Sequence, residues 1–165
     1  MLHIKLVGVD GIGTNLLLFL PRYLAYQQKE EVELTLIDGD AFEGRNRERQ
    51  AFSVLGNKAQ AKATELRAEF PEITVLAEPV FVTPQNIRQL IRGGDIVLLA
   101  VDNHRTRLLV SRRCKQLANI TLISGGNALV DGNVQVYIRR NRKDLTVPLE
   151  RFHPEIRSPQ DQNPG

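Results

Sequence analysis

Residues 7–15, VGVDGIGTN, join an apolar run of strand length to the start of a long apolar helical stretch. Gly8, Gly11 and Gly13 fall in the turn between the two elements, where backbone N–H groups and the positive end of the helix dipole would converge. The turn therefore predicts an anion site. The glycines alone do not decide whether the anion is a nucleotide phosphate, because a tight βα turn in any α/β protein also uses glycine.

Short β-rich runs alternate with helical stretches along the rest of the chain. Besides residues 4–9, strands are expected over 32–38, 73–81, 95–102 and 120–126. Helices are expected from about residue 13, with a kink or restart at Pro21, and over 57–70, 83–92 and 104–118. This alternation predicts an α/β, three-layer Rossmann-like domain with a mainly parallel, twisted sheet. Pro79 favours an edge position for the third strand, and Asp131-Gly132 indicates a C-terminal hairpin.

The length of 165 residues is that of one ordinary domain, and 42% hydrophobic with 25% charged residues is typical of a globular chain. Residues 1–140 are expected to form this domain. Residues 141–165 are expected to form an extended or disordered tail, since three prolines and no apolar period occur near its end. No segment approaches the roughly 20 apolar residues of a membrane helix, and the N-terminus lacks the order of a signal peptide. The sequence thus predicts a cytoplasmic protein without a membrane partner.

The net charge is +3, with arginine-rich stretches at 104–115 and 139–143. This charge would suit an anionic ligand, but few aromatic residues are interleaved with it, so nucleic-acid binding is not favoured. Cys114 is the single cysteine, so it cannot form an intramolecular disulfide and has no second cysteine for a zinc site. We expect a buried, inert thiol and no zinc.

An acidic pair follows the second strand. Asp38 ends that strand about 25 residues after Gly13, where a carboxylate can accept hydrogen bonds from ribose hydroxyls. In the simpler alternative, Asp38 and Asp40 merely begin a loop, where aspartate is common. Beyond them, residues 46–50 (NRERQ) and Lys58 place cationic groups where a triphosphate would need its charge neutralised. Hydride transfer has no such need, so the pattern favours a nucleoside triphosphate over a dinucleotide.

From about Lys5 to Ile138, the chain resembles the ThiF/MoeB/HesA family, the bacterial relatives of ubiquitin-activating enzymes. The resemblance rests on five motifs in the family's order: a glycine loop, a strand-end D-x-D, an N-x-x-R-Q, a lysine before a helix, and a strand-end D-N. The matching positions are Gly8, Gly11 and Gly13; Asp38 and Asp40; Asn46, Arg49 and Gln50; Lys58; and Asp102 and Asn103. Five motifs in the right order form a specific signal.

The resemblance implies ATP-dependent adenylation of the C-terminal carboxylate of a ubiquitin-like protein or peptide, by a homodimer that uses ATP and Mg²⁺. It implies that Asp38 holds the ribose and that Asn46 helps to position the nucleotide, with the other motif residues contributing to nucleotide binding. Arg49 and Lys58 would lie on the phosphates, and Asp102 would ligate magnesium; these three residues would have the catalytic roles. Such roles agree with phosphoryl chemistry, which depends chiefly on positioning and on neutralising charge.

Simpler explanations stay open for each of these residues. Arg49 would then be a surface charge, Lys58 a helix-face lysine, and Asp102 the N-cap of the following helix. Two other function classes also stay open: a non-catalytic nucleotide-binding or protein-interaction module, and an NAD-dependent oxidoreductase. The oxidoreductase leaves the two cations and Asp102 without a role.

The sequence departs from the family pattern in four ways. Asp10 replaces a glycine of the family's G-x-G-G-x-G. Aspartate tolerates a left-handed backbone, but its charge 4 Å from a phosphate would cost about 4 kcal/mol at an effective dielectric near 20, unless a metal or a lysine intervenes. The family's N-terminal helix with its arginine, its paired C-x-x-C motifs and its thioester-forming cysteine have no match in these residues. We therefore expect either a minimal adenylating domain or a domain cut from a longer protein.

Overall fold

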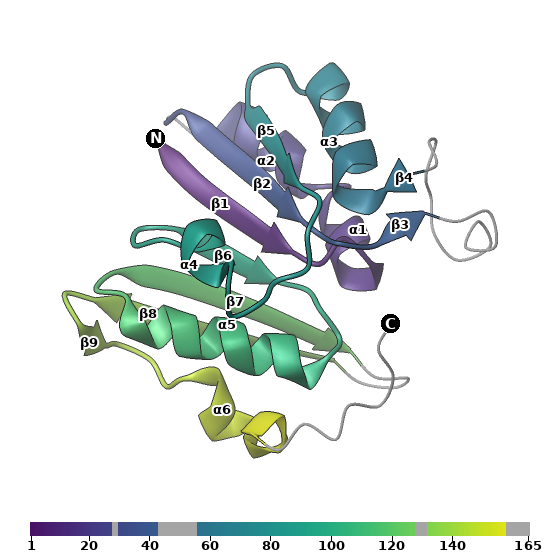
Figure 1. Cartoon of the computed structure of the whole chain (residues 1–165). Coiled ribbons are helices and arrows are strands. Elements are labelled where there is room, and N and C mark those ends of the chain that lie inside the picture. Colours follow the sequence, from purple (N-terminus) through teal and green to yellow (C-terminus); the bar gives the residue numbers. More distant parts are fainter. Residues whose placement is uncertain (28–29, 43–55, 128–131, 158–165) are drawn as a thin grey trace.

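The computed structural model describes residues 1–27, 30–42, 56–127 and 132–157, and this part of the chain contains one seven-stranded sheet (Figure 1). Its strands are β1 (Leu2–Val7), β2 (Val32–Ile37), β5 (Thr74–Glu78), β6 (Ile96–Leu99), β7 (Ile120–Asn127), β8 (Gly132–Arg140) and β9 (Lys143–Asp144). The spatial order is β5-β2-β1-β6-β7-β8-β9, with parallel pairing from β5 to β7 and antiparallel pairing of β8 and β9. The prediction of a mainly parallel sheet is confirmed.

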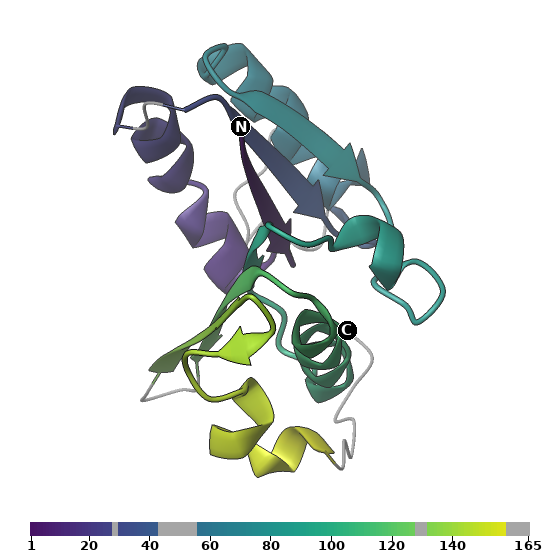
Figure 2. The ribbon, with the colours of Figure 1, turned by 90° about the vertical axis from the view of Figure 1, so that its left-hand side faces the viewer.

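Helices cover both faces of the sheet. On one face lie α1 (Gly11–Leu16), α2 (Leu20–Gln27) and α3 (Lys58–Glu69); on the other lie α4 (Ile87–Leu90), α5 (His104–Gln116), α6 (Leu149–Phe152) and the 3₁₀ helix η2 (Pro154–Arg157). Figure 2 shows α1 and α2, in purple and blue, on the opposite side of the sheet from α5, in green. The three-layer Rossmann-like architecture is therefore confirmed. None of the helices in the described ranges is long and apolar enough to cross a membrane.

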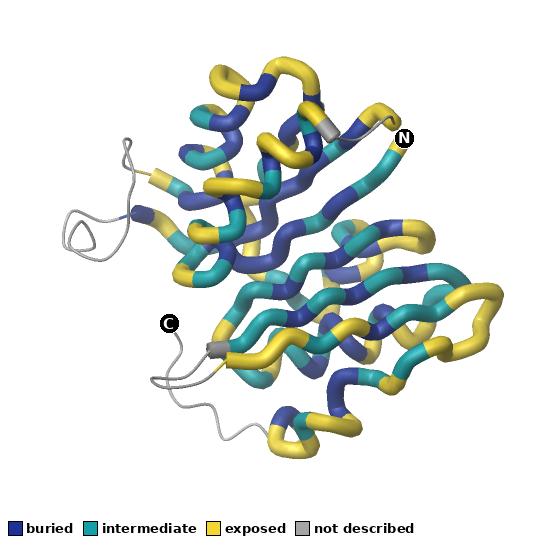
Figure 3. Tube along the Cα trace, turned by 180° about the vertical axis from the view of Figure 1, so that it is seen from behind, coloured by how far each residue is buried: buried dark blue, intermediate teal, exposed yellow. Residues whose placement is uncertain are grey.

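Two apolar clusters on opposite faces of the sheet form the core. Leu6 and Leu34 pack in the cluster beneath α1 to α3, whereas Val97 and Leu122 pack in the cluster beneath α4 to α6. All four side chains are fully buried, because central parallel strands are covered on both faces. Figure 3 shows the buried residues along these strands and, in the lower half of the view, strands that no helix covers on this face.

Two prolines act as the sequence predicts. The first helical stretch ends at Leu16 and restarts as α2 at Leu20, so that Pro21 lies in the first helical turn, where its missing N–H leaves no hydrogen bond unmade. The strand before Pro79 ends at Glu78 and lies at the edge of the sheet. The expected hairpin is also present, since β7 pairs with β8 and Asn127 lies opposite Gly132; Asp131 is outside the described residues.

The helix expected over 83–92 is much shorter than predicted. Only α4 is α-helical there, because the side chain of Asn86 holds the preceding residues in a turn. Its Oδ1 accepts from the backbone N–H of Thr83 at 2.8 Å, and its Nδ2 donates to the carbonyl of Phe81 at 2.9 Å. Such local side-chain bonds compete with helical hydrogen bonds.

The prediction of an extended or disordered tail is wrong for residues 149–157. This segment is helical in α6 and η2 and packs on α5. The carboxylate of Glu150 accepts from the Ser111 hydroxyl at 2.5 Å and from Lys115 Nζ at 2.9 Å, and Ile156 is 1% exposed. Few apolar residues suffice because each is buried against a surface that α5 and β8 already form. Residues 158–165 lie outside the described residues.

Candidate functional site

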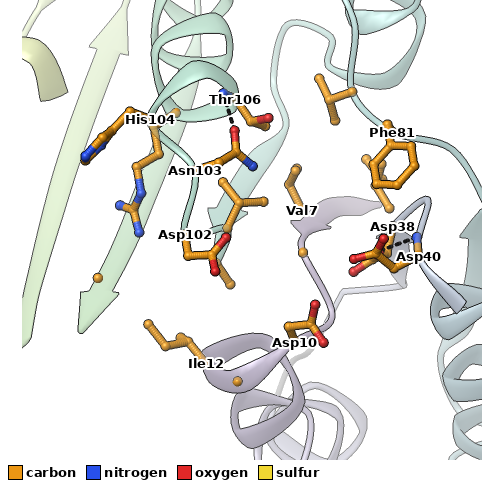
Figure 4. Close-up of a pocket in the computed structure, with 18 of the residues that line it drawn as sticks. Val7, Asp10, Ile12, Asp38, Asp40, Phe81, Asp102, Asn103, His104 and Thr106 are labelled. Carbon is orange, nitrogen blue, oxygen red and sulfur yellow. Dashed lines mark hydrogen bonds between the residues drawn. The ribbon is translucent and has the colours of Figure 1, made fainter. Parts of the chain in front are cut away.

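A cavity of about 490 Å³ opens at the carboxyl ends of β1, β2 and β6. The connections after β1 and β6 leave to opposite faces of the sheet, and such a switch point is where open α/β sheets bind ligands. Seven of the residues that the sequence predicts for the site line this cavity: Gly8, Gly11, Asp38, Asp40, Lys58, Asp102 and Asn103. Figure 4 shows Asp38, Asp40 and Phe81 on one side of it, Asp102 and Asn103 on the other, and Asp10 at its base.

The glycines of the first turn have different structural roles. Gly8 and Gly11 adopt φ of +93° and +30°, which favours glycine. Gly13 lies beneath the turn and does not line the cavity; a Cβ there would come within 2.1 Å of the Gly8 carbonyl oxygen. Asp10 has φ −98° and ψ 170°, an extended conformation open to any residue, so the left-handed backbone considered for it does not occur. The loop keeps its shape without glycine at position 10.

Asp38 organises the backbone around the cavity. Its carboxylate accepts from the N–H of Val9 at 2.6 Å and from the N–H of Asp40 at 2.8 Å, which links the glycine loop to the end of β2. The residue is 8% exposed. Burial raises the pKa of Asp38, although the two N–H donors favour its ionised form. Both carboxylate oxygens are thus already engaged by backbone.

Asn57 holds the acidic loop against the start of α3. Its Oδ1 caps the helix by accepting from the N–H of Gln60 at 3.1 Å, and its Nδ2 donates to the carbonyls of Asp38 and Asp40 at 2.8 and 3.0 Å. The next residue, Lys58, donates its backbone N–H to the Asp40 carbonyl at 2.8 Å. These bonds fix the point from which the lysine side chain enters the cavity. Sequence reasoning did not identify either role of Asn57.

Lys58 forms an ion pair inside the glycine loop. Its Nζ lies 2.6 and 2.7 Å from the two carboxylate oxygens of Asp10 and 3.5 Å from Oδ2 of Asp40. The lysine side chain is 6% exposed and that of Asp10 is 43% exposed. Burial opposes the charged form of Lys58, but the hydrogen bond and the charge of Asp10, together with the charge of Asp40, outweigh it and raise the pKa of Lys58. Lys58 therefore offsets the charge of Asp10, and the sequence alone did not identify this pair.

The start of α5 forms the other side of the cavity. Asn103, not Asp102, caps this helix, with Oδ1 accepting from the N–H of Thr106 at 2.8 Å. Asp102 is exposed and faces the cavity. One turn into the helix, Arg107 donates to Ser124 Oγ at 3.0 Å and to the Gly125 carbonyl at 2.7 Å. Burial lowers the pKa of Arg107, and the charge of Asp102 opposes that shift.

Several residues that line the cavity were missed by sequence reasoning. They are Phe81, His104, Arg107, His153 and Glu155. Arg107 could have been found, since it lies one helical turn after the capping Asn103. The aromatic ring of Phe81 lies so close to the backbone after β2 that a Cβ at Gly39 would come within 2.5 Å of it. Nothing in the sequence indicated that residues 153–156 would return to the site.

Three predicted site residues, Asn46, Arg49 and Gln50, lie outside the described residues. Within the described ranges, no group of three His, Cys, Asp or Glu side chains is arranged to hold a metal. Mg²⁺ usually takes only one or two protein carboxylates and completes its shell with water and substrate phosphates. The exposed carboxylate of Asp102 fits that kind of site, and a closed protein cage is not needed.

The doubly wound sheet, with a glycine loop and acidic strand ends at its switch point, defines a Rossmann-like domain. The chain matches the ThiF family over residues 1–163, and it belongs to that family.

Two curated relatives are similar over most of this chain. "Adenylyltransferase and sulfurtransferase MOCS3" of Drosophila sechellia is 34% identical over 138 residues, which are 81% of this chain and 29% of the relative. "tRNA threonylcarbamoyladenosine dehydratase" of Haemophilus influenzae is 31% identical over 154 residues, which are 89% of this chain and 56% of the relative. The chain therefore spans well under two thirds of the length of either protein.

Solved structures show the same fold. The E. coli tRNA N6-threonylcarbamoyladenosine dehydratase TcdA in complex with AMP has a TM-score of 0.63 and 30% identity, and the similarity covers 76% of this chain and 51% of that one. E. coli MccB with ATP has a TM-score of 0.68 and 22% identity, over 84% of this chain and 41% of that one.

Proposed function

We propose that this chain carries out ATP-dependent adenylation of the C-terminal carboxylate of a ubiquitin-like protein or peptide. One observation carries the proposal: a single cavity at the switch point brings together the glycine loop, the acidic end of β2, Lys58 and Asp102. These groups belong to motifs up to about 90 residues apart in the sequence. Membership of the ThiF family, and relatives named as an adenylyltransferase and as an AMP complex, support the same chemistry.

The nucleoside end of the cavity lies at the carboxyl end of β2. Phe81 offers an apolar ring there, and the close approach of Gly39 leaves no room for a side chain between them. Asp40 is the better ribose acceptor, because its side chain is 32% exposed, whereas Asp38 is 8% exposed and holds two backbone N–H groups. We therefore propose Asp40 beside Asp38 for the ribose, with Asp38 also shaping the loop.

The phosphates would lie over the glycine loop. Gly8 and Gly11 carry no side chains that would cover the loop, and the Lys58 ammonium lies beside it, paired with Asp10. Asp102 would hold Mg²⁺, which neutralises phosphate charge when bound. Arg49, outside the described residues, is assigned to the phosphates from its motif alone.

In the proposed reaction, a carboxylate oxygen of the acceptor attacks the α-phosphorus of ATP. A bond forms between that oxygen and the α-phosphorus, and the bond from the α-phosphorus to the bridging oxygen breaks. Pyrophosphate leaves, and the acceptor becomes an acyl-adenylate. The residues of this chain position the two reactants and offset the charge that moves to the leaving group.

Calorimetric titrations with Mg-ATP and with NAD test the ligand. We expect Mg-ATP to bind and Lys58→Ala to weaken it about ten-fold to hundred-fold, since the variant loses the ammonium and leaves the Asp10 carboxylate uncompensated beside the phosphates, a change of roughly 1.5–3 kcal/mol. Lys62→Ala is the matched control, because Lys62 lies one turn further along α3 and pairs with Glu65 at 2.8 Å, outside the cavity. Binding of NAD without ATP would contradict the proposal.

Pyrophosphate exchange tests catalysis. Labelled pyrophosphate should enter ATP only when an acceptor with a free C-terminal carboxylate is present, and an acceptor amidated at that carboxylate should be inactive. ATP binding without exchange, across a panel of ubiquitin-like proteins and peptides, would favour a non-catalytic nucleotide-binding module instead. The pairing of Lys58 with Asp10 is the observation that favours this second candidate.

We also propose a homodimer, on the basis of the family resemblance. Sedimentation velocity over a range of protein concentrations measures this directly. A monomer at all concentrations would contradict it.

A further inference from the structure

An acidic side chain within the glycine loop, Asp10, is paired with the lysine that we assign to the phosphates, Lys58. The two carboxylate oxygens of Asp10 lie 2.6 and 2.7 Å from Nζ of Lys58, although the two residues are 48 positions apart in the sequence. Both residues line the cavity, and the lysine is nearly inaccessible to solvent. A phosphate that approaches Lys58 therefore meets a neutralised pair and not a free positive charge.

The backbone gives no reason for aspartate at position 10. Its extended conformation suits any residue, and its side chain makes no capping bond to α1. The carboxylate instead points away from the helix to Lys58. Its pairing with Lys58 therefore acts on the electrostatics of the loop.

Acidic groups outnumber basic groups among the described residues that line the cavity. The acidic residues are Asp10, Asp38, Asp40, Asp102 and Glu155, and the basic residues other than histidine are Lys58 and Arg107. Each phosphate added to a nucleotide brings more negative charge toward this surface. Because Coulomb energy at short range in a partly buried site amounts to several kcal/mol per charge pair, the Asp10 carboxylate repels a triphosphate more than a monophosphate.

We propose that Asp10 is a specificity-determining residue that sets the preference of the cavity for low phosphate charge. It lowers the affinity for ATP and leaves the affinity for adenosine unchanged. The cavity therefore binds an adenylate in preference to a triphosphate. The same charge favours departure of pyrophosphate once it has formed. This inference rests on the proposed function, because it places the nucleotide phosphates at Lys58.

The test compares adenosine, AMP and ATP by calorimetry on the wild-type chain and on Asp10→Asn, in buffer without divalent cations. Asparagine keeps the size of the side chain and removes its charge. We expect ATP to bind about ten-fold to hundred-fold more tightly to the variant, AMP to gain less, and adenosine to stay within about two-fold. Added Mg²⁺ should reduce the gain for ATP, since the cation screens the phosphates.

Two further variants guard the interpretation. Asp10→Ala should give the same order of gains, which excludes a new hydrogen bond from the asparagine amide. Glu69→Gln removes one carboxylate of an exposed pair with Arg22, far from the cavity lining, and should change none of the three affinities. Thermal unfolding of each variant shows that it is folded.

The outcomes separate this inference from the proposed function. If the wild-type chain and both Asp10 variants bind nucleotides but the ratio of ATP to adenosine affinity stays the same, or falls in the variants, the role of Asp10 is overturned and adenylation stands. If neither the wild-type chain nor the variants bind any of the three ligands, the proposed function fails and this inference fails with it.

Discussion

Single carboxylates of similar sequence context have different environments in this protein. Asp38 is buried and engaged by two backbone N–H groups, Asp40 is partly exposed and 3.5 Å from Lys58, and Asp10 is paired closely with that lysine. Burial, backbone donors and a facing cation act separately on a carboxyl group. Asp38 therefore shapes the loop, Asp40 keeps a partly exposed carboxylate, and Asp10 offsets the charge of Lys58.

The Lys58–Asp10 pair should contribute to folding stability in a defined pH range. Its lysine has a pKa raised above the ordinary value of 10.5, so the stabilisation is fully present below about pH 10.5 and is lost as pH rises through the higher folded-state value. Because Asp10 is nearly half exposed, we expect Asp10→Asn to cost only about 1 kcal/mol at pH 8. Urea unfolding at pH values from 8 to 11.5 measures the difference between wild type and variant.

That difference should shrink above pH 10.5. A difference that stays constant or grows toward pH 11.5 would mean that the ammonium of Lys58 is not what stabilises the pair. Glu69→Gln serves as the control, since its pair with Arg22 is exposed and contains no lysine.

At the scale of elements, a short C-terminal segment completes one wall of the cavity. The bonds from Ser111 and Lys115 to Glu150 attach α6 to α5, and Ile156 in η2 is buried in the same cluster. Between these anchors, His153 and Glu155 line the cavity. The contacts that attach residues 149–157 to α5 therefore also place this wall of the cavity.

Ile156→Ala should destabilise the domain and weaken ligand binding together. Loss of a buried isoleucine side chain costs about 2 to 4 kcal/mol through lost transfer energy and the cavity left behind. Phe152→Ala on α6 is the matched control, because Phe152 is 59% exposed and its loss should change stability by at most about 0.5 kcal/mol. Chemical denaturation and ATP titration of both variants check this. Equal stability of the two variants would show that η2 does not support the fold.

At the scale of the whole molecule, the strand order decides where chemistry can occur. The chain winds outward from β1 in one direction and from β6 in the other, so the connections that follow these neighbouring strands leave to opposite faces of the sheet, with a cavity between them. The two apolar clusters lie on opposite faces of this one sheet. The cavity therefore lies at the ends of central strands of the sheet.

The single thiol should report unfolding of this framework. Cys114 is fully buried within α5, and burial raises its pKa to about 12, so that little thiolate forms at neutral pH. We expect a thiol reagent at pH 8 to label the native chain at least about a thousand-fold more slowly than the urea-unfolded chain. Cys114→Ser provides the blank. Full labelling of the native chain within minutes would mean that α5 opens locally.

Much of the fold could be predicted because its signals are local. Apolar runs of strand length, the glycines at 8, 11 and 13, and Pro21 and Pro79 each act through nearby backbone, so the alternation of strands and helices follows from them. The helix predicted at 83–92 failed where the single side chain of Asn86 outweighed helix propensity. The prediction of an unstructured tail failed because its few apolar residues are stabilised only by packing on α5 and β8, which are formed by earlier parts of the chain.

The sequence by itself determined the α/β class, the glycine loop and the acidic strand end, since these depend on residue types at short spacing. Only the tertiary structure decided that Lys58 pairs with Asp10, 48 residues away in the sequence. It also decided that the carboxylate of Asp38 accepts two backbone N–H bonds, and that residues of η2 line the cavity. Ion pairs and burial act through space, over distances that the packing of α3 and α5 on the sheet sets. Asp10, the residue of VGVDGIGTN that departs from the family's glycine loop, is therefore the partner of Lys58 at the start of α3.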